Sequence, residues 1–278
     1  MSDDAPRYVH GTSPREQERL ALMNDILNRG ALLLIGLRGG ERVLDLGCGT
    51  GQLSRDLARA AGGPGRAVAI ERSTDQLREA RRLAHDAGEE GLVDFREGDA
   101  LSPPLRDEEW SRFDLAHTRF LLEHLPRPIA VVRVMLRAVR PGGRIILQDE
   151  DHDILRLWPE PEGVGALWRA YISSYEHQGN DPCVGRKLPA LLHEAGARPV
   201  RSSWIDFGAC AGQARFPALV ENMARILEGA QEAIVGTGLL GREGCRAALA
   251  ALRLWGERPD AALYYALACV EGVRPGTE

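Results

Sequence analysis

The stretch Val43–Gly51, VLDLGCGTG, constrains the fold of this chain more than any other. Apolar residues surround Asp45, and glycine follows at positions 47, 49 and 51. We therefore expect a buried strand that runs into a loop with almost no side chains, so that a ligand can lie against bare backbone. Leu53 and Leu57 then recur at helical spacing. The predicted unit is strand, glycine loop and helix, which binds a nucleoside at the carboxyl end of the first strand in α/β sheets.

The spacing of the glycines and the charge of Asp45 indicate which nucleoside is bound. Dinucleotide-binding loops have the pattern G-x-G-x-x-G, in which a helix N-terminus faces a pyrophosphate. Here the pattern is G-x-G-x-G, with a carboxylate two residues before the first glycine. That carboxylate repels a pyrophosphate but suits a ligand that carries an ammonium and a sulfonium group. A nicotinamide-dependent (NAD) oxidoreductase is the less favoured alternative, because Gln52 and Leu53 do not complete the dinucleotide pattern.

This stretch resembles the first motif of the class I S-adenosylmethionine (SAM)-dependent methyltransferases. Two later segments resemble the same family, FDLAHTRFLLEHLPRP from Phe113 and the L-x-x-x-R-P-G-G crossover from Leu136. The segment DPCVGRKL from Asp181 resembles one in a bacterial subgroup that acts on small molecules. The resemblance implies an α/β fold with a seven-stranded, mostly parallel, doubly wound sheet. Its seventh strand is expected to lie antiparallel between the fifth and sixth.

Periodicity outside the motifs indicates helical additions to this sheet. Leu20, Met23, Ile26 and Leu27 lie on one face of a predicted helix. Residues 1–36 are therefore expected to form an N-terminal helical cap. Residues 37–278 are expected to form the SAM-binding domain, with helical lid insertions at about 154–196 and 210–258. Strands are predicted near residues 67–71, 93–96, 113–118, 145–147, 200–207 and 263–273.

The resemblance implies a cofactor site at the carboxyl ends of the first four strands. Asp45 and the glycine loop are expected at the amino-acid end of SAM, and Arg119 at its carboxylate or at a substrate anion. Glu71 ends the second strand, where one carboxylate can accept hydrogen bonds from both ribose hydroxyls. Asp99 is expected to accept a hydrogen bond from the adenine amino group. The predicted cofactor-binding residues are Asp45, Gly47, Cys48, Gly49, Gly51, Gln52, Glu71, Arg72, Asp99, Ala100, Thr118 and Arg119.

The run QDEDHD, residues 148–153, follows the fifth strand. Ionisable runs usually form solvated loops, but the carboxyl ends of the fourth and fifth strands flank the transferable methyl group in this fold. Alternation along an extended chain places the three aspartates on one side and Glu150 and His152 on the other. We expect one of these sets to face the acceptor. The predicted catalytic residues are His152, Asp151 and Glu150, with His152 the best-placed base; no metal ligand is predicted.

Aromatic residues after the fifth strand suggest a cover over the methyl donor. Trp168, Tyr171 and Tyr175 recur at helical spacing, a pattern that serves a core, a binding surface or both. Arg186 either anchors a substrate anion or, as we favour, forms a structural ion pair. Tyr8 and His10 precede the sheet, where similar methyltransferases have a segment that folds over the cofactor; a frayed terminus is the alternative. The predicted substrate-binding residues are Tyr8, His10, Asp149, Trp168, Tyr171, Tyr175 and Arg186.

Composition indicates which class of acceptor is disfavoured and in which compartment the protein is expected. The formal net charge is −5, with 40 acidic and 35 basic side chains interspersed, which disfavours extended nucleic-acid binding. No apolar run approaches the roughly 18 residues of a membrane span, and the N-terminal residues lack the pattern of a signal peptide. Five cysteines without a C-x-x-C pair fit a reducing cytoplasm.

The sequence thus predicts a cytoplasmic enzyme that transfers a methyl group from SAM to a small molecule, natural products included, and releases S-adenosylhomocysteine (SAH). Oxygen and nitrogen acceptors are favoured over carbon. Transfer is an in-line displacement that depends on alignment and on exclusion of water, and a base is required only where the acceptor must lose a proton. An RNA or protein methyltransferase and a non-catalytic SAM-binding protein are the alternatives, and a homodimer is left open.

Overall fold

The computed structural model describes residues 14–64 and 66–276, and within these it leaves out the side chains of residues 14–23 and 25. Its centre is a seven-stranded sheet in the order β3-β2-β1-β4-β5-β10-β7. β10 is antiparallel to both β5 and β7, and the other neighbours are parallel. The predicted sheet and its inserted antiparallel strand are confirmed. The strands are β1 (Val43–Leu46), β2 (Ala67–Glu71), β3 (Val93–Glu97), β4 (Phe113–Arg119), β5 (Val139–Asp149), β7 (Arg198–Asp206) and β10 (Ala266–Val273).

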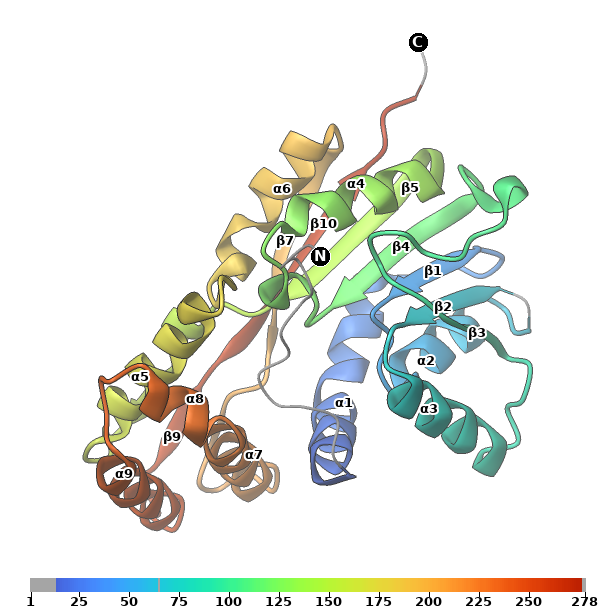
Figure 1. The fold of residues 1–278 in the computed structure, drawn as a ribbon. Helices are drawn as coiled ribbons and strands as arrows, with labels where there is room; N and C mark the ends of the chain where they lie inside the picture. Colours follow the sequence, from blue (N-terminus) through green and yellow to red (C-terminus); the bar gives the residue numbers. More distant parts are fainter. Residues whose placement is uncertain (1–13, 65, 277–278) are drawn as a thin grey trace.

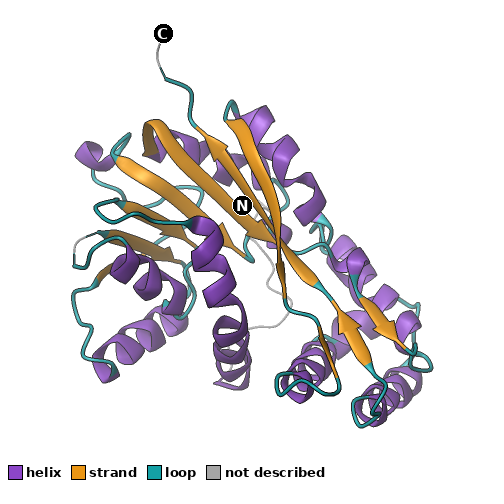
Figure 2. Cartoon of the chain, turned by 180° about the vertical axis from the view of Figure 1, so that it is seen from behind, coloured by secondary structure: helices purple, strands orange, loops and turns teal. Residues whose placement is uncertain are grey.

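Helices cover both faces of this sheet, as Figure 1 and the opposite view in Figure 2 show. α1 (Pro14–Ile35), α2 (Gln52–Ala60) and α3 (Thr74–Asp86) lie on one face, and α4 (Pro128–Ala138) and α6 (Leu188–Ala195) on the other. Successive strand residues point to opposite faces, so that Val43 and Leu44 belong to two different core clusters. Both faces of the inner strands are therefore buried, which explains why β1 and β2 are nearly all apolar, whereas the edge strands β3 and β7 carry charged and polar residues.

A second group of elements, here called the lid, lies beyond the ends of β7 and β10 (Figure 1). A small antiparallel sheet in the order β6-β9-β8 joins four helices there. One core cluster runs from α1 and α2 into the lid, so the two parts share apolar packing. The lid consists of β6 (Arg156–Trp158), α5 (Val164–His177), β8 (Ala209–Cys210), α7 (Phe216–Gly229), α8 (Gln231–Gly236), α9 (Arg242–Trp255) and β9 (Ala262–Tyr264).

Two boundaries differ from those predicted. The predicted insertion at 154–196 includes α6, yet α6 packs against α4, β7 and β10 and therefore covers the sheet. Its buried residues Leu188 and Leu192 lie in the core cluster of that face. The predicted strand at 263–273 is interrupted at Tyr265, where the chain passes from the lid sheet to the central sheet. In the part of the chain that is described, no helix combines the length and apolar character needed to cross a membrane.

Candidate active site

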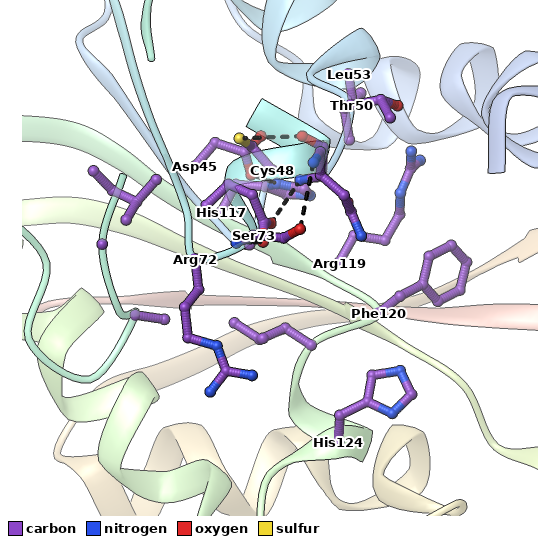
Figure 3. A pocket seen from close by; sticks show the side chains of 18 of the residues that line it. Asp45, Cys48, Thr50, Leu53, Arg72, Ser73, His117, Arg119, Phe120 and His124 are labelled. Carbon is purple, nitrogen blue, oxygen red and sulfur yellow. Dashed lines mark hydrogen bonds and ion pairs between the residues drawn. The ribbon is translucent and has the colours of Figure 1, made fainter. Parts of the chain in front are cut away.

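The loops after β1, β2, β3 and β4 meet at one edge of the sheet and line a cavity of about 330 Å³, here called the loop cavity (Figure 3). Gly47 and Gly49 have φ values of 74° and 56°, which glycine adopts without strain. Backbone therefore lies open to the cavity at these positions, as the sequence pattern suggested. The predicted cofactor-binding residues that line it are Asp45, Gly47, Cys48, Gly49, Glu71, Arg72, Asp99, Ala100 and Arg119.

Asp45 lies at the base of the loop cavity and is held by two side chains. The register of β1 and β4 pairs it with His117, whose Nδ1 lies 2.8 Å from Oδ1. Ser54 of α2 donates a hydrogen bond to Oδ2 at 2.5 Å. A carboxylate oxygen can accept more than one hydrogen bond, so this fixed group can still bind an ammonium. His117 in turn contacts Gln148 of β5, with 3.3 Å between Nε2 and Oε1.

Glu71 and Asp99 extend the acidic lining of the loop cavity. Glu71 accepts hydrogen bonds from the amides of Gly49 at 3.0 Å and Ser73 at 2.7 Å. Its burial raises its pKa, because burial penalises the charged form. Asp99 accepts a hydrogen bond from the amide of Leu101 at 2.8 Å. Both carboxylates thus have fixed orientations, and their assignment to ribose and adenine stays a prediction.

Arg119 brings a buried guanidinium to the same cavity. Its Nη2 donates to Asn28 Oδ1 at 2.9 Å and also to Asn24 Oδ1. Among the described residues its Nη1 has no hydrogen-bond partner although it is buried. Burial lowers the pKa of Arg119 to about 10. Because buried polar groups are normally satisfied, an unsatisfied guanidinium nitrogen at the cavity fits a ligand carboxylate such as that of SAM.

Three predicted cofactor residues do not line the loop cavity. Gly51 packs against Phe95, whose ring carbons would lie 2.6 Å from a Cβ at position 51. Gln52 is the first residue of α2 and lies outside the lining. Thr118 is fully buried and donates a hydrogen bond to the carbonyl of Leu46 at 2.8 Å. The structure assigns the glycine and the threonine to packing between neighbouring elements.

A smaller cavity of about 70 Å³, here called the lid cavity, adjoins the first, and Phe120 and His124 line both. Phe120 directly follows β4 and has a φ of 55°, a left-handed conformation that strains a non-glycine residue. Figure 3 shows Phe120 and His124 apart from the cluster of Asp45, Cys48 and His117. The predicted residues that line the lid cavity are Glu150, His152, Trp168, Tyr171 and Tyr175.

His152 is the centre of the polar side chains in the lid cavity. Its Nδ1 lies 2.7 Å from Tyr265 Oη and its Nε2 lies 3.0 Å from Glu123 Oε2. Glu150 Oε2 is 3.6 Å from the same Nε2. Burial lowers the pKa of His152, which favours the neutral imidazole. Four rings surround it at centroid distances of 5.3 to 6.4 Å, those of Trp168, Tyr171, Tyr175 and Tyr265.

The aspartates of the QDEDHD run point away from both cavities. Asp149 accepts hydrogen bonds from the amides of Leu122 at 2.8 Å and Glu150 at 3.0 Å. Asp151 receives two hydrogen bonds from the guanidinium of Arg186, at 2.5 and 2.6 Å. Arg186 therefore forms the structural ion pair that we favoured, and none of these three residues lines either cavity. Of the two alternating sets, Glu150 and His152 face the lid cavity.

Some site residues were not predicted, and two predictions cannot be placed. Tyr8 and His10 lie outside the described residues. Glu123 lies within the motif FDLAHTRFLLEHLPRP, shortly after the predicted fourth strand, where a titratable side chain was a detectable signal. Tyr265 had none, because its neighbours resemble one continuous strand. The lining residues of the lid cavity that we did not predict include Phe120, Glu123, Phe207, Asn222, Met223 and Tyr265.

Glu123, Glu150 and His152 are also close enough to one another for a metal, with one ligand atom from each within 4.8 Å of the others. Both ring nitrogens of His152 are, however, engaged by protein groups. An imidazole must offer a free lone pair to bind a metal. We therefore assign these three residues to hydrogen bonding.

Comparison with known proteins identifies the family. A family model described as a methyltransferase domain matches residues 37–193, more than half of the chain. The chain therefore belongs to the class I SAM-dependent methyltransferases, and its cofactor is SAM.

Individual relatives show how far the similarity extends. The ubiquinone/menaquinone biosynthesis C-methyltransferase UbiE of Pseudomonas putida is 34% identical over 134 residues, 45% of this chain and 51% of the relative. This chain spans about half the length of the curated relatives it matches. The crystal structure of the cyclase SpnF is similar in fold, with a TM-score of 0.54 and 22% sequence identity. The match covers 99% of this chain and 87% of SpnF. The structure of geranyl diphosphate C-methyltransferase from Streptomyces coelicolor A3(2) matches with a TM-score of 0.54 and 14% sequence identity. The match covers 96% of this chain and 86% of that enzyme.

Proposed function

We propose that this chain binds SAM in the loop cavity and transfers its methyl group to an oxygen or nitrogen atom of a small acceptor in the lid cavity. The observation that carries this proposal is that the two cavities adjoin at Phe120 and His124. In-line displacement requires the donor carbon and the acceptor atom to meet in one orientation. The lid helices would exclude water from the place where the methyl carbon and the acceptor atom react.

The lining of the lid cavity supports a small, largely apolar acceptor. Its walls are mainly aromatic and aliphatic side chains from the lid, and its described lining contains neither lysine nor arginine. RNA binding relies on positive charge along a polyanion. An RNA acceptor is therefore the weaker alternative, and a cavity of about 70 Å³ also favours a small group over a protein segment.

Transfer to carbon is the second candidate. The relative UbiE is named as a C-methyltransferase, and a neighbour with the same fold is a geranyl diphosphate C-methyltransferase. A diphosphate acceptor needs cationic groups, which the described lining of the lid cavity does not offer. The lining therefore favours an acceptor with an oxygen or nitrogen nucleophile over a diphosphate ester that is methylated on carbon. The similar fold of SpnF belongs to a cyclase, so this fold also supports reactions other than methyl transfer.

A reducing cytoplasm is part of the proposal. Cys48, Cys183, Cys210, Cys245 and Cys269 are all unpaired thiols. Persistent disulfides are typical of oxidising compartments and rare in the cytosol. The unpaired cysteines support the cytoplasmic location that the composition suggested.

The cofactor assignment is tested by Glu71→Ala. The Glu71 carboxylate accepts hydrogen bonds from the backbone amides of Gly49 and Ser73, so its removal should weaken SAM binding by about tenfold or more through the lost ribose hydrogen bonds. Isothermal titration calorimetry measures the Kd, and transfer of radioactive methyl to a panel of small phenols and amines measures activity. Glu97→Ala is the matched control, because Glu97 pairs with Glu71 across β2 and β3 but lies outside the cavity.

Each result has a defined meaning. An unchanged Kd in Glu71→Ala removes Glu71 from the cofactor site. Failure of the wild-type protein to bind SAM contradicts the proposed function as a whole. Binding without methyl transfer to any acceptor of the panel supports the non-catalytic alternative.

A further inference from the structure

The hydrogen bonds around His152 indicate whether the acceptor is a hydroxyl compound or an amine. This inference rests on the proposed methyl transfer. We propose that Tyr265, His152 and Glu123 form a proton relay, and that the acceptor is an apolar hydroxyl compound whose proton leaves through Tyr265. The three side chains come from the β9–β10 connection, from the short helix η3 (His152–Ile154) that follows β5, and from the short helix η2 (Leu122–His124). The tertiary fold alone brings them together.

The hydrogen-bond partners determine how the protons are arranged. A carboxylate only accepts hydrogen bonds, so the Nε2 of His152, 3.0 Å from Glu123, carries a proton. In the neutral imidazole Nδ1 is then an acceptor, and it receives the hydroxyl of Tyr265 at 2.7 Å. The lone pairs of Tyr265 Oη thus remain available to accept a further hydrogen bond. The relay is oriented from the cavity towards Glu123.

Tyr265, and not His152, is the member that meets the acceptor. His152 is 1% exposed, its two nitrogens are engaged, and the rings of α5 enclose it. Tyr265 is 8% exposed and lines the lid cavity beside Phe207, at a ring distance of 4.9 Å. An acceptor in the cavity can therefore reach the tyrosine hydroxyl.

The chemical step balances with these groups and SAM alone. The acceptor oxygen forms a bond to the methyl carbon, the carbon–sulfur bond breaks, and its electron pair stays on sulfur to give SAH. The acceptor proton passes to Tyr265 Oη while the tyrosine proton passes to Nδ1 of His152. The resulting imidazolium is paired with Glu123, and it returns its proton to solvent after product release.

The charged and titratable groups facing His152 favour this transfer. Glu123 of η2 and Glu150, which follows β5, are acidic neighbours of the imidazole, and Asp151 adds to them although Arg186 pairs with it. Tyr171 and Tyr175 of α5 also face the ring. Behind them, His124 lies 3.6 Å from Glu123 (Nε2 to Oε1) and stacks on Tyr175, and the pKa of Asp149 is raised by burial and by Glu123. Burial raises the pKa of Tyr265, so that this side chain passes a proton on and does not lose it to solvent.

Methylation of an amine does not require the hydrogen-bonded network of Tyr265, His152 and Glu123. An amine attacks SAM as the free base, so that no proton has to leave during transfer. A hydroxyl is a weak nucleophile until its proton is removed, and general-base assistance contributes about 10²-fold or more to such steps. The relay is therefore the feature that distinguishes a hydroxyl acceptor from an amine.

The experiment compares phenol with aniline, the smallest aromatic hydroxyl and amine, as acceptors for radioactive SAM, using the full chain and its Tyr265→Phe variant. We expect methylation of phenol, and a fall of about 10²-fold in kcat in the variant with a much smaller change in KM. Wild-type kcat should fall as the pH drops below the range where His152 is neutral. In Tyr265→Phe, kcat should instead rise steadily with pH as hydroxide replaces the relay.

Tyr264→Phe is the matched control, because Tyr264 is the adjacent tyrosine, is 60% exposed and lies outside both cavities. The Kd for SAM reports on folding of each variant. If Tyr265→Phe does not fold, the ¹⁵N spectrum of wild-type His152, identified by its loss in His152→Gln, should show the tautomer protonated at Nε2.

The outcomes separate the relay from the underlying methyl transfer. Methylation of aniline alone, or of neither compound while SAM is bound, overturns the hydroxyl assignment. A Tyr265→Phe variant with wild-type kcat and pH profile, a tautomer protonated at Nδ1, or activity that chelation by EDTA abolishes, overturns the relay. Absence of SAM binding instead contradicts the proposed function.

Discussion

At the scale of single residues, the buried carboxyl groups near the two cavities are oriented by specific partners. Asp45 accepts a hydrogen bond from Ser54 and pairs with His117. Asp149 accepts hydrogen bonds from two backbone amides, and Asp151 forms an ion pair with Arg186. Leaving a buried charged group without its partner costs more than the net contribution of the hydrogen bond itself. Substitution of any one partner should therefore disturb the orientation of the group that remains.

His152→Gln should alter how stability depends on pH. The folded protein holds His152 with a lowered pKa, whereas in the unfolded chain the imidazole titrates near 6.5. Below pH 6.5 the unfolded chain binds a proton that the folded chain does not, so stability falls as the pH drops towards the lowered pKa. This loss has a maximum slope of about 1.4 kcal/mol per pH unit, and the variant should lack it.

Urea denaturation at pH 7.5 and at pH 5.5 measures this difference. His193→Gln, which removes an exposed imidazole from α6, is the control and should keep the wild-type dependence. Parallel losses of stability in wild type and His152→Gln would show that His152 is not held neutral. The carboxyls with raised pKa values act with the opposite sign, but they are common to both proteins.

At the scale of elements, the short helix η4 (Val184–Lys187) supports the end of β5. The amide of Gly185 donates to the carbonyl of Glu150 at 2.8 Å. A Cβ on Gly185 would lie 2.7 Å from the Glu150 carbonyl oxygen and 2.8 Å from its carbonyl carbon. Since backbone cannot yield as a flexible side chain does, only glycine fits between η4 and the residues that carry Glu150 and His152.

Gly185→Ala should therefore destabilise the protein by about 1 to 3 kcal/mol, the range for overpacking. It should also lower methyl transfer more than SAM binding, because the clash lies beside the lid cavity. Urea denaturation measures the stability, calorimetry the Kd for SAM, and transfer of radioactive methyl the activity. Gly212→Ala is the control, since nothing lies within 4 Å of a Cβ there. Equal stability of both variants would show that η4 moves freely away from β5.

The elements also differ in how far the sequence predicts them. Inner strands of the central sheet such as β1 and β2 were predicted because each has a run of apolar residues, and β3 because its apolar and charged residues alternate. β6, β8 and β9 have three residues or fewer, which is too short for a periodic pattern. Their strand conformation comes from pairing with one another, so it depends on contacts between residues far apart in the chain.

At the scale of the whole molecule, SAH should stabilise the fold by mass action. The loop cavity requires the ends of four strands together, so the unfolded chain has no equivalent site. SAH at about 100 times its Kd should add about 2.7 kcal/mol to the free energy of unfolding. Thermal unfolding with and without SAH measures this gain. Glu71→Ala at the same SAH concentration should gain less, and an equal gain would place the binding site elsewhere.

The sequence by itself determined the central sheet and the position of the cofactor loop. Both depend on local patterns, namely apolar runs, the glycine spacing and the carboxylates in or at the end of strands, such as Asp45 in β1 and Glu71 at the end of β2. Only the tertiary structure decided the lid cavity, because Glu123, His152 and Tyr265 are far apart in the chain and no local pattern links them. Their meeting depends on how β10 returns between β5 and β7 and how the lid packs, which is a property of the whole fold.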